Sequence, residues 1–397
     1  MALSAWVLAS CAAPTQQGGV VVAPGAGERF MLAMSMGYLG SFDRAMVPGQ
    51  VRRALLRDQL PSGPAATAKV GDYVLENGHL LAAVTNVDGT TRGGRLVDLA
   101  RKPTQADGLD GLELEVLGEK VVYDALKTGR DEATFTAYVE VSGRIDATHR
   151  GGPLVTVSTR YDVAPGVDAI VVSTHIKLER GAFAEGDSAP SLFDETLVAK
   201  SPMPPIADVT AGFGATLGDG GGYLLRPMSD GASLTTTSIS PRVRVPATQG
   251  PALGDAIVVT RVVSPLERAD SSAVAVALAK TDGKGIGDIE VRVAPRGPGA
   301  RYPKRGDLSF VSASGESFLA CDLDATGDDS HFAASMPEGR YTMVFRNGAL
   351  ESEGVPVVIE KDRTGFTTVA AAVREKAEPT PPGPSACISP ASHDPPR

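Results

Sequence analysis

Two histidines and two carboxylates are the residues whose types and positions could support acid–base chemistry. His149 and His175 lie on or next to the strands of one predicted hairpin. A histidine on the polar face of a strand can act as a general base, and a carboxylate such as Glu140 or Asp162 would orient its ring. Sugar mutarotation would need an acid–base pair of this kind. The alternative is that both are surface or hydrogen-bonded histidines of a sheet.

A carboxylate-rich segment near the C-terminus has part of the spacing of a calcium loop. Asp322, Asp324 and Thr326 take positions 1, 3 and 5 of an EF-hand loop, and a glycine follows at position 6. Position 12 should be a bidentate glutamate but is Ala333. We therefore expect a turn between strands, and the alternative is a weak surface calcium site that uses Asp322, Asp324 and Asp328.

Other signatures of catalysis or cofactor binding are missing from the sequence. It contains no nucleophile elbow, no P-loop and no Rossmann glycine pattern after a strand. Its cysteines lack the spacing of a metal site. We therefore expect no metal centre and no cofactor. The formal net charge of −9 argues against nucleic acid as a partner, because phosphate binding needs a basic face.

The elements that would carry these residues alternate between apolar and polar side chains. Residues 134–141 have period two, which puts one row of side chains on a core. Residues 154–163 and 169–179 are predicted to form a long antiparallel hairpin with its turn at 164–166. The 45 Gly and 29 Pro favour many short strands over long helices. The sequence therefore predicts an all-β protein in which residues 46–280 form a large antiparallel, supersandwich-like β-sandwich.

Several local predictions complete this unit. Leucines and arginines at helical spacing predict a short amphipathic helix at 46–60, and Ser142-Gly143 is predicted to form a turn. The stretch 181–221 is rich in Gly, Pro, Ser and Asp, and we expect a long irregular loop that forms a ligand-facing edge. Further strands are expected at 73–76, 80–85, 94–99, 112–117, 222–226, 256–263 and 273–279.

A second unit is predicted at residues 286–372. Its short strand-like runs suit a small Ig-like or transthyretin-like β-sandwich. Residues 373–397 are rich in Pro and Ser, and we expect them to form a disordered tail. Cys321 of this unit and Cys387 of the tail either form a disulfide in an exported protein or remain unpaired thiols.

The N-terminus resembles that of a bacterial lipoprotein. Leu8-Ala9-Ser10-Cys11 follows a short apolar run and resembles a lipobox, whose cysteine receives a diacylglyceryl group and becomes the new N-terminus. The resemblance implies a signal peptide at 1–10, a lipidated Cys11 with a flexible tether over 11–45, and a cell-envelope location in the outer membrane or facing the periplasm. Because no positive residue precedes Cys11, an ordinary apolar N-terminus with a chance cysteine is the alternative.

The large unit resembles exported bacterial β-sandwiches. The motifs are Gly71-Asp72-Tyr73-Val74-Leu75-Glu76-Asn77-Gly78, then residues 80–84, then Gly93-Gly94-Arg95-Leu96-Val97-Asp98. In some of these proteins the sandwich precedes a PHP-type metallohydrolase domain, but the His-x-His motif that opens that domain is missing here. The resemblance thus implies a fold and a compartment without a hydrolase. The shape is also similar to the supersandwich of sugar mutarotases and polysaccharide lyases, and this likeness transfers no catalytic residue.

Residues 286–372 resemble the carboxypeptidase regulatory-like domain. The residues that carry the resemblance are Asp322-Leu323-Asp324-Ala325-Thr326-Gly327, His331-Phe332 and Met336-Pro337-Glu338-Gly339-Arg340-Tyr341. In that family the first segment is a turn, and the Pro-x-Gly-x-Tyr segment leads into the next strand. The resemblance implies an added structural or adhesion module.

Together these features predict a non-enzymatic envelope lipoprotein that presents β-sandwich modules for ligand binding or surface structure. Its expected partners are the membrane, through the lipid anchor, and glycans or other envelope proteins. Two alternatives stay open. One is a carbohydrate-active enzyme of the mutarotase or polysaccharide-lyase type that uses a cleft near 181–221. The other is an accessory subunit of a separate envelope hydrolase.

Overall fold

The computed structural model describes residues 47–63, 65–102, 107–183, 190–200, 205–208, 212–218, 221–237, 240–297, 301–327, 329–348 and 350–373. Over these residues the protein is all-β, as predicted, with one α-helix. The described part contains no helix that is long and apolar enough to cross a membrane. Several predictions fall outside it, namely the signal peptide 1–10, the tether 11–45 with Cys11, Asp328, Cys387, and the tail 373–397 apart from Val373.

The large unit contains three antiparallel sheets. The four-stranded sheet has the order β1 (Gln50–Arg53), β2 (Tyr73–Glu76), β3 (Leu80–Val84) and β4 (Leu96–Arg101). The eight-stranded sheet has the order β12 (Ile206–Asp208), β13 (Phe213–Gly218), β14 (Gly221–Pro227), β17 (Ala256–Pro265), β10 (Ile170–Arg180), β9 (Leu154–Val163), β8 (Thr136–Asp146) and β7 (Tyr123–Asp131). The five-stranded sheet has the order β15 (Ser233–Thr236), β16 (Pro241–Val245), β11 (Phe193–Ala199), β5 (Leu109–Val116) and β6 (Glu119–Lys120). Short 3-10 helices lie at Arg57–Gln59, Thr148–Arg150 and Ala247–Gln249.

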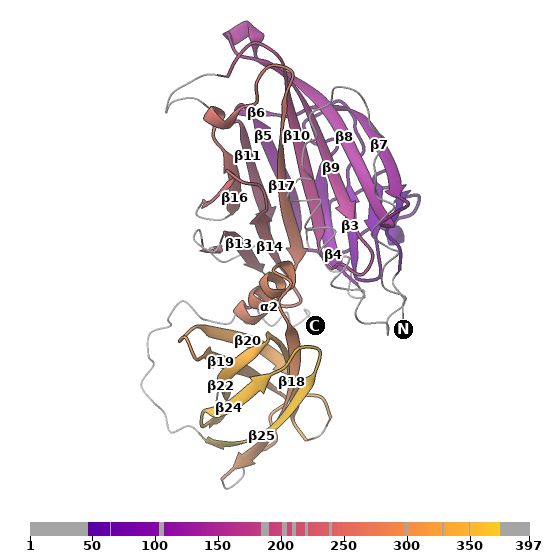
Figure 1. Ribbon diagram of the computed structural model, residues 1–397. Helices are drawn as coiled ribbons and strands as arrows, with labels where there is room; N and C mark the ends of the chain where they lie inside the picture. The colour runs from indigo at the N-terminus through magenta and orange to yellow at the C-terminus, as the bar shows by residue number, and fades with distance from the viewer. Residues whose placement is uncertain are drawn as a thin grey trace, which may run out of the picture.

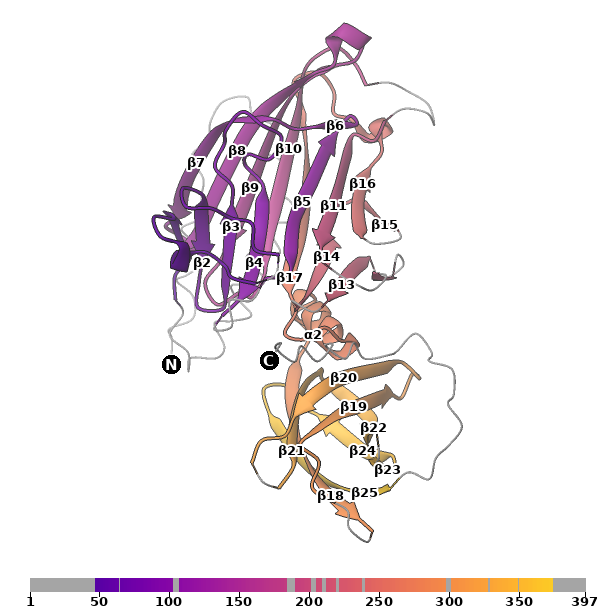
Figure 2. The same ribbon diagram turned by 180° about the vertical axis from the view of Figure 1, so that it is seen from behind.

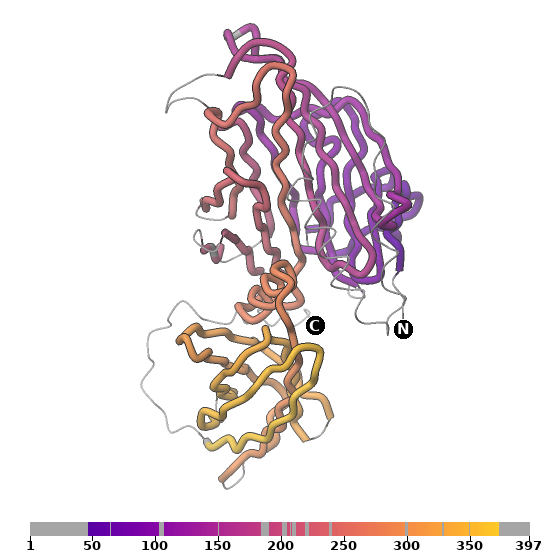
Figure 3. Tube along the Cα trace, viewed as in Figure 1, coloured from indigo at the N-terminus to yellow at the C-terminus, as the bar shows by residue number. Residues whose placement is uncertain are grey.

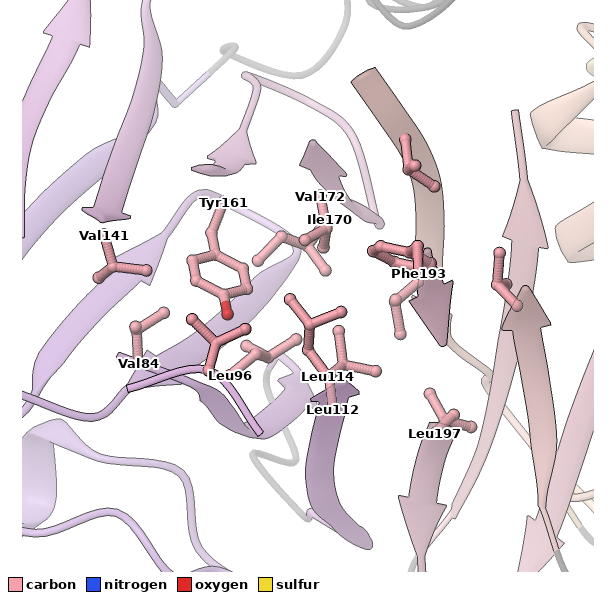
Figure 4. Packing of buried hydrophobic residues seen from close by; sticks show 14 of the residues in the cluster. Val84, Leu96, Leu112, Leu114, Val141, Tyr161, Ile170, Val172, Phe193 and Leu197 are labelled. Atoms are coloured by element: carbon pink, nitrogen blue, oxygen red, sulfur yellow. The ribbon is translucent and has the colours of Figure 1, made fainter. Parts of the chain in front are cut away.

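These three sheets form two layers around one core. The eight-stranded sheet is one layer (Figure 1), and the four- and five-stranded sheets lie side by side in the other (Figure 2). Side chains from all three sheets meet between the layers, among them Val84, Tyr161 and Phe193 (Figure 4). This double layer is the large antiparallel β-sandwich that the alternating sequence predicts.

The predicted hairpin lies in the middle of the eight-stranded sheet. β9 pairs with β10 so that Tyr161 is opposite Val172 and Thr159 is opposite Thr174. All four side chains are buried, which confirms the predicted inward row. Gly166 in the turn between the two strands has φ 71°, a left-handed conformation that favours glycine.

A buried ion pair crosses the core of the large unit. Arg261 of β17 is fully buried, and its Nε donates to Oε2 of Glu195 on β11 at 2.6 Å, while Nη2 donates to Oε1. Its Nη1 donates to Thr174 Oγ1 at 2.7 Å and to the main-chain oxygens of Val172 and Val259 at 3.3 and 3.1 Å. Each guanidinium nitrogen therefore has a partner, and this is the condition under which a charge can be buried.

The small unit is built from a single sheet with its own core. The strand order is β20 (Ser317–Asp324), β19 (Arg305–Ser312), β22 (Gly339–Asn347), β23 (Leu350–Ser352), β25 (Thr364–Val373), β18 (Ile286–Arg296) and β21 (His331–Pro337), and β24 (Val355–Ile359) also pairs with β22. Its core includes Val291, Phe310 and Phe345. The turn expected over residues 322–327 begins later, because Asp322 and Asp324 belong to β20 and the chain turns only after them, before β21. Pro337 ends β21 just before β22 begins, as the Pro-x-Gly-x-Tyr motif predicts.

The helix α2 (Ser271–Thr281) connects the two units. It follows β17 of the large unit and precedes β18 of the small unit (Figure 3). Ala273 and Val274 of the helix pack with Leu217, Leu224 and Leu266 of the large unit. The helix also contacts β20 and β21 of the small unit.

The strand predicted at 273–279 is therefore wrong. Val and Leu alternate there with Ala, but alanine is apolar as well, so the pattern does not separate two faces. Asp270 Oδ1 accepts the main-chain N–H of Ala273 at 2.8 Å and so caps a helix whose alanines have the highest helix propensity.

The helix predicted at 46–60 is also wrong. β1 pairs with β2, and the segment after it forms the 3-10 helix Arg57–Gln59. Leu55 and Leu56 are exposed instead of facing a core. β2 supplies the main-chain hydrogen-bond partners of β1, and this pairing outweighs the helical preference that the spacing of the leucines indicates.

The turn predicted at Ser142-Gly143 is a third error, because both residues lie inside β8. A Cβ on Gly143 would come within 2.2 Å of the main-chain oxygen of Val122, so this glycine permits a close approach of two strands. The chain reverses farther on, where Gly151 has φ 75°.

The stretch 181–221 is not one irregular loop. Its described residues include β11, β12 and β13, and Phe193, Glu195 and Leu197 of β11 alternate inward. The remaining strand predictions overlap β2, β3, β4, β5, β14 and β17.

We expect Glu195→Ala to lower the free energy of unfolding by about 3–5 kcal/mol, because it leaves the Arg261 charge buried without its partner. Chemical denaturation followed by circular dichroism measures this change. The matched control is Glu113→Ala, because Glu113 is exposed on the neighbouring strand β5 and pairs with Lys120 at the surface at 3.3 Å. The free energy of unfolding of this control should stay within about 0.5 kcal/mol of that of the parent. Equal losses in both variants would contradict the role of the buried pair.

Candidate functional site

A crevice at the junction of the two units is the candidate site. Its enclosed space is about 20 Å³, room for about one water molecule, and its mouth opens to solvent. Its walls come from the end of β4, the β9–β10 turn, the residues after β17, the helix α2 and β21 of the small unit. The charged and hydroxyl residues that line it are Arg101, Asp168, Ser264, Glu267, Arg268, Lys280, Thr281 and Ser335.

Asp270, which precedes α2, fixes two residues that line the crevice, Arg268 and Ala273. Its Oδ1 accepts hydrogen bonds from Ala273 N and Ser272 Oγ at 2.8 and 2.7 Å. Its Oδ2 accepts from Arg268 Nε at 2.7 Å and from the main-chain N–H of Cys321 at 3.1 Å. One carboxylate therefore caps the helix, holds a crevice arginine and binds the small unit.

Ser271 makes a second bond to the same strand. Its Oγ accepts the main-chain N–H of Leu319 at 2.8 Å. β20 is an edge strand, whose free N–H groups would otherwise be available to another strand. The start of α2 satisfies two of these groups, at Leu319 and Cys321, and so fixes the small unit against the helix.

The other end of α2 is fixed to the large unit by ion pairs. Lys280 Nζ lies 2.5 Å from Oδ2 of Asp168 in the β9–β10 turn, and Arg226 of β14 pairs with Asp282. Burial acts to raise the pKa of Asp168, but the charge and hydrogen bond of Lys280, with Arg101 nearby, outweigh it and lower the pKa overall. Asp168 is therefore ionised at neutral pH.

The crevice offers charges of both signs to a ligand. Arg101, Arg268 and Lys280 are its cations, and Glu267 lies 3.7 Å from Arg101 with about half of its side chain exposed. Ser335 Oγ donates to Asp288 at 2.6 Å. None of the lining residues is a histidine or a cysteine. This arrangement can bind a polar ligand by hydrogen bonds and charge.

The two predicted catalytic histidines lie apart from this crevice. His149 is exposed in the 3-10 helix between β8 and β9, and its Nδ1 lies 3.1 Å from the main-chain oxygen of Asp146. His175 is exposed on β10, opposite Ser158 of β9. Of the carboxylates expected to orient them, Glu140 accepts a hydrogen bond from Ser158, and Asp162 pairs with Arg160 at 2.8 Å.

The predicted calcium ligands are engaged by an arginine. Arg305 of β19 lies 2.9 Å from Asp324 and 3.7 Å from Asp322. Over the described residues, no group of three or more His, Cys, Asp or Glu side chains could hold a metal ion, and Asp328 lies outside them. Cys321 is a disulfide-bonded cysteine, and the pairing with Cys387 remains a prediction because Cys387 is not described.

Sequence reasoning missed every residue of the crevice. An available signal was Asp270 directly before the Ala-rich run 271–279, since an Asp before an apolar segment marks the start of a helix. Identifying α2 would have indicated a junction in which a helix touches both units. The partners Asp168 and Lys280 are 112 residues apart and carry no local signal.

A second buried carboxylate was also missed. Asp107 Oδ1 accepts hydrogen bonds from Leu99 N, Leu109 N and the Tyr223 hydroxyl at 2.9, 3.1 and 2.9 Å. Its Oδ2 is buried and has no hydrogen-bond partner among the described residues. Burial, together with the nearby charge of Asp98, raises the pKa of Asp107 to about 7.

Comparisons with known proteins add little to this picture. No protein-family model and no curated protein matches the chain. Among solved structures, a TPR-domain containing protein from Parabacteroides distasonis is 11% identical with a TM-score of 0.31, and the match covers 56% of this chain and 54% of that one. A galactose mutarotase-like protein from Lactobacillus casei is 8% identical with a TM-score of 0.30, covering 49% of this chain and 100% of that one. The minor pilin GBS52 from Streptococcus agalactiae is 11% identical with a TM-score of 0.19, covering 57% and 92%. The chain thus spans about half the length of the first of these, and at such scores the likenesses carry no argument about function.

We expect Asp270→Ala to lower the free energy of unfolding by roughly 2–4 kcal/mol, because it removes a helix cap and the partner of the Cys321 N–H. Ser271→Ala removes only the partner of the Leu319 N–H and should cost about 1 kcal/mol. Differential scanning calorimetry measures both. Asp230→Ala, at an exposed aspartate of the large unit, is the control and should change little. An Asp270→Ala protein as stable as the control would show that this carboxylate does not hold the junction.

We expect Asp107 to make the protein less stable as the pH rises from about 4 to about 7. Its pKa is about 3.8 when unfolded and about 7 when folded, so over this interval only the folded state keeps the proton. Its contribution is fully present below pH 4 and falls by about 1.4 kcal/mol for each pH unit up to about 7.

Urea unfolding at a series of pH values tests this expectation. Asp107→Asn mimics the protonated acid and should remove this part of the pH dependence, with the variant gaining on the parent as the pH approaches 7. Parallel pH profiles for the parent and the variant would show that Asp107 is ionised in the folded protein.

Proposed function

We propose that the protein is a non-enzymatic lipoprotein of the cell envelope that presents two β units, joined through α2, for ligand binding or surface structure. The observation that carries the proposal is the junction, where α2 bonds to both units through Asp270, Ser271 and Lys280. The helix α2 thus belongs to the contacts of both units.

The arrangement of charged groups supports binding over catalysis. In the core, every guanidinium nitrogen of Arg261 donates to an internal acceptor, and two of them donate to the carboxylate of Glu195. In the crevice, Asp168 is held ionised by Lys280. Such groups fix a structure, because their polar atoms are used on internal partners.

The crevice supports a binding role because ligand sites are common where two units meet. Its mixture of arginine, lysine and carboxylate side chains suits a polar ligand with several hydroxyl or charged groups, such as a segment of glycan or a loop of another envelope protein. The carboxypeptidase regulatory-like motif of the small unit is consistent with an added structural or adhesion module.

The lipid anchor supplies the first test. We expect the mature protein, extracted from the membrane fraction of its native host, to have the mass of a chain that begins at Cys11 plus a diacylglyceryl group. Intact mass spectrometry measures this directly. The control is Cys11→Ser, which cannot accept the lipid and should leave the membrane fraction. A water-soluble protein that still carries Met1 would contradict the proposal.

A further inference from the structure

We propose that one rim of the four-stranded sheet docks on an anionic lipid surface. We call it the leucine–arginine rim, and it consists of Arg53, Leu55, Leu56, Arg57, Lys69 and Val70. The inference deepens the proposed function, because a lipid anchor would hold this rim close to a bilayer. Four observations support the inference: the geometry of the rim, its exposure, its charge and the number of residues between it and Cys11.

Two short segments lie side by side to form the rim. Ala54 N donates to Asp72 O and Gly71 N donates to Ala54 O, both at 2.8 Å. Arg53 Nε donates to Gly71 O at 2.9 Å, and Arg57 Nη1 donates to Ala68 O at 2.5 Å. The side chains of both arginines therefore link the segments.

The apolar residues of the rim point to solvent in a fixed conformation. Leu55, Leu56 and Val70 are 71%, 59% and 57% exposed. The main-chain N–H groups of both leucines donate to Gln59 Oε1, at 2.8 and 3.3 Å. Ala54, directly before them, is fully buried, so the core beneath the rim is already filled. The leucines thus have no place to pack within the described part of the protein.

The charge of the rim is opposite to that of the whole chain. The formal net charge of the chain is −9, but Arg53, Arg57 and Lys69 are all exposed cations. Within the described residues none of these three is in an ion pair, and the arginine hydrogen bonds go to uncharged carbonyl groups. Asp58 is the exposed acid of the same segment. The charge of Asp98 acts on Arg57 and that of Asp88 acts on Lys69, while Arg53 has no such acid among the described interactions. The exposed groups of the rim, three cations and Asp58, leave it locally positive.

Exposed leucines flanked by cations match the chemistry of a membrane surface. Apolar side chains enter the boundary between headgroups and acyl chains, while arginine and lysine remain with anionic headgroups. A second copy fits this rim less well, because a two-fold contact between identical rims would bring cations against cations. We therefore assign an anionic lipid surface as the occupant.

The length of chain before the rim is compatible with this contact. Between Cys11 and Val47 there are 36 steps along the chain. Covalent geometry limits the reach of 36 residues to roughly 120–130 Å. A lipid on Cys11 would thus keep the rim within reach of the bilayer.

The experiment compares variants of the full-length chain, all carrying Cys11→Ser so that no lipid is attached. Each is sedimented with vesicles made of equal parts phosphatidylglycerol and phosphatidylethanolamine. We expect L55E/L56E to lower vesicle binding more than tenfold, and R53Q/R57Q to lower it about 25-fold, or roughly fivefold for each cation. Binding of the parent should weaken as salt is added and should be lost on pure phosphatidylcholine.

The control is L253E, because Leu253 is 66% exposed outside the rim, and it should bind like the parent. Circular dichroism and the thermal midpoint confirm that each variant folds. Parent-like binding by both double variants would overturn the proposal. A parent that is oligomeric without vesicles while both double variants are monomeric would also overturn it, because the rim would then be a protein interface. Because Cys11 is substituted throughout, the result does not depend on whether the natural protein is lipidated.

Discussion

The relation between the two units depends on the carboxylate of Asp270. Its two oxygens accept four hydrogen bonds, from the helix start, from Arg268 and from the edge strand β20. A carboxylate is suited to this task because it accepts several bonds at once and is favoured at the positive end of a helix. The N–H of an edge strand is thereby used inside the protein, so the same interaction that orients the small unit also protects its sheet from pairing with another chain.

The buried charges obey the same rule in the large unit. Arg261 and Glu195 lie in the core only because each guanidinium nitrogen has an acceptor, and the pair connects the two layers of the sandwich. Asp107 is the contrasting case, since one of its oxygens is buried without a described partner and its pKa rises. Lys280 thus lowers the pKa of Asp168, whereas burial without a facing cation raises that of Asp107.

Much of the fold could be predicted from the sequence, because one face of most strands is buried. The alternation predicted β8, β9 and β10, and it gave the inward rows of β8 from Ala137 onward and of β10 correctly, but Phe135, the first member of the row expected over residues 134–141, lies before β8 and is 48% exposed. The same rule failed for α2, where alanine and valine are both apolar. Alternation also could not predict the buried ion pair or the crevice. Arg261 and Glu195 are 66 residues apart, and Lys280 and Asp168 of the crevice are 112 apart, so only the folded chain brings each pair together. The lipid anchor, the Cys321–Cys387 pairing and the calcium ligand Asp328 concern residues outside the described part and remain predictions.

Leu55 and Leu56 are exposed because their segment forms a strand and a 3-10 helix instead of the predicted amphipathic helix. As a helix, this segment would turn its leucines toward a core, but β1 pairs with β2 instead and uses the backbone groups that a helix would need. Gln59 then takes the N–H groups of Leu55 and Leu56 and fixes both side chains outward. Each leucine thereby forgoes about 1.5–3 kcal/mol of burial. The two adjacent exposed leucines with Arg53 and Arg57 beside them are the combination from which the proposal of an anionic lipid surface is argued.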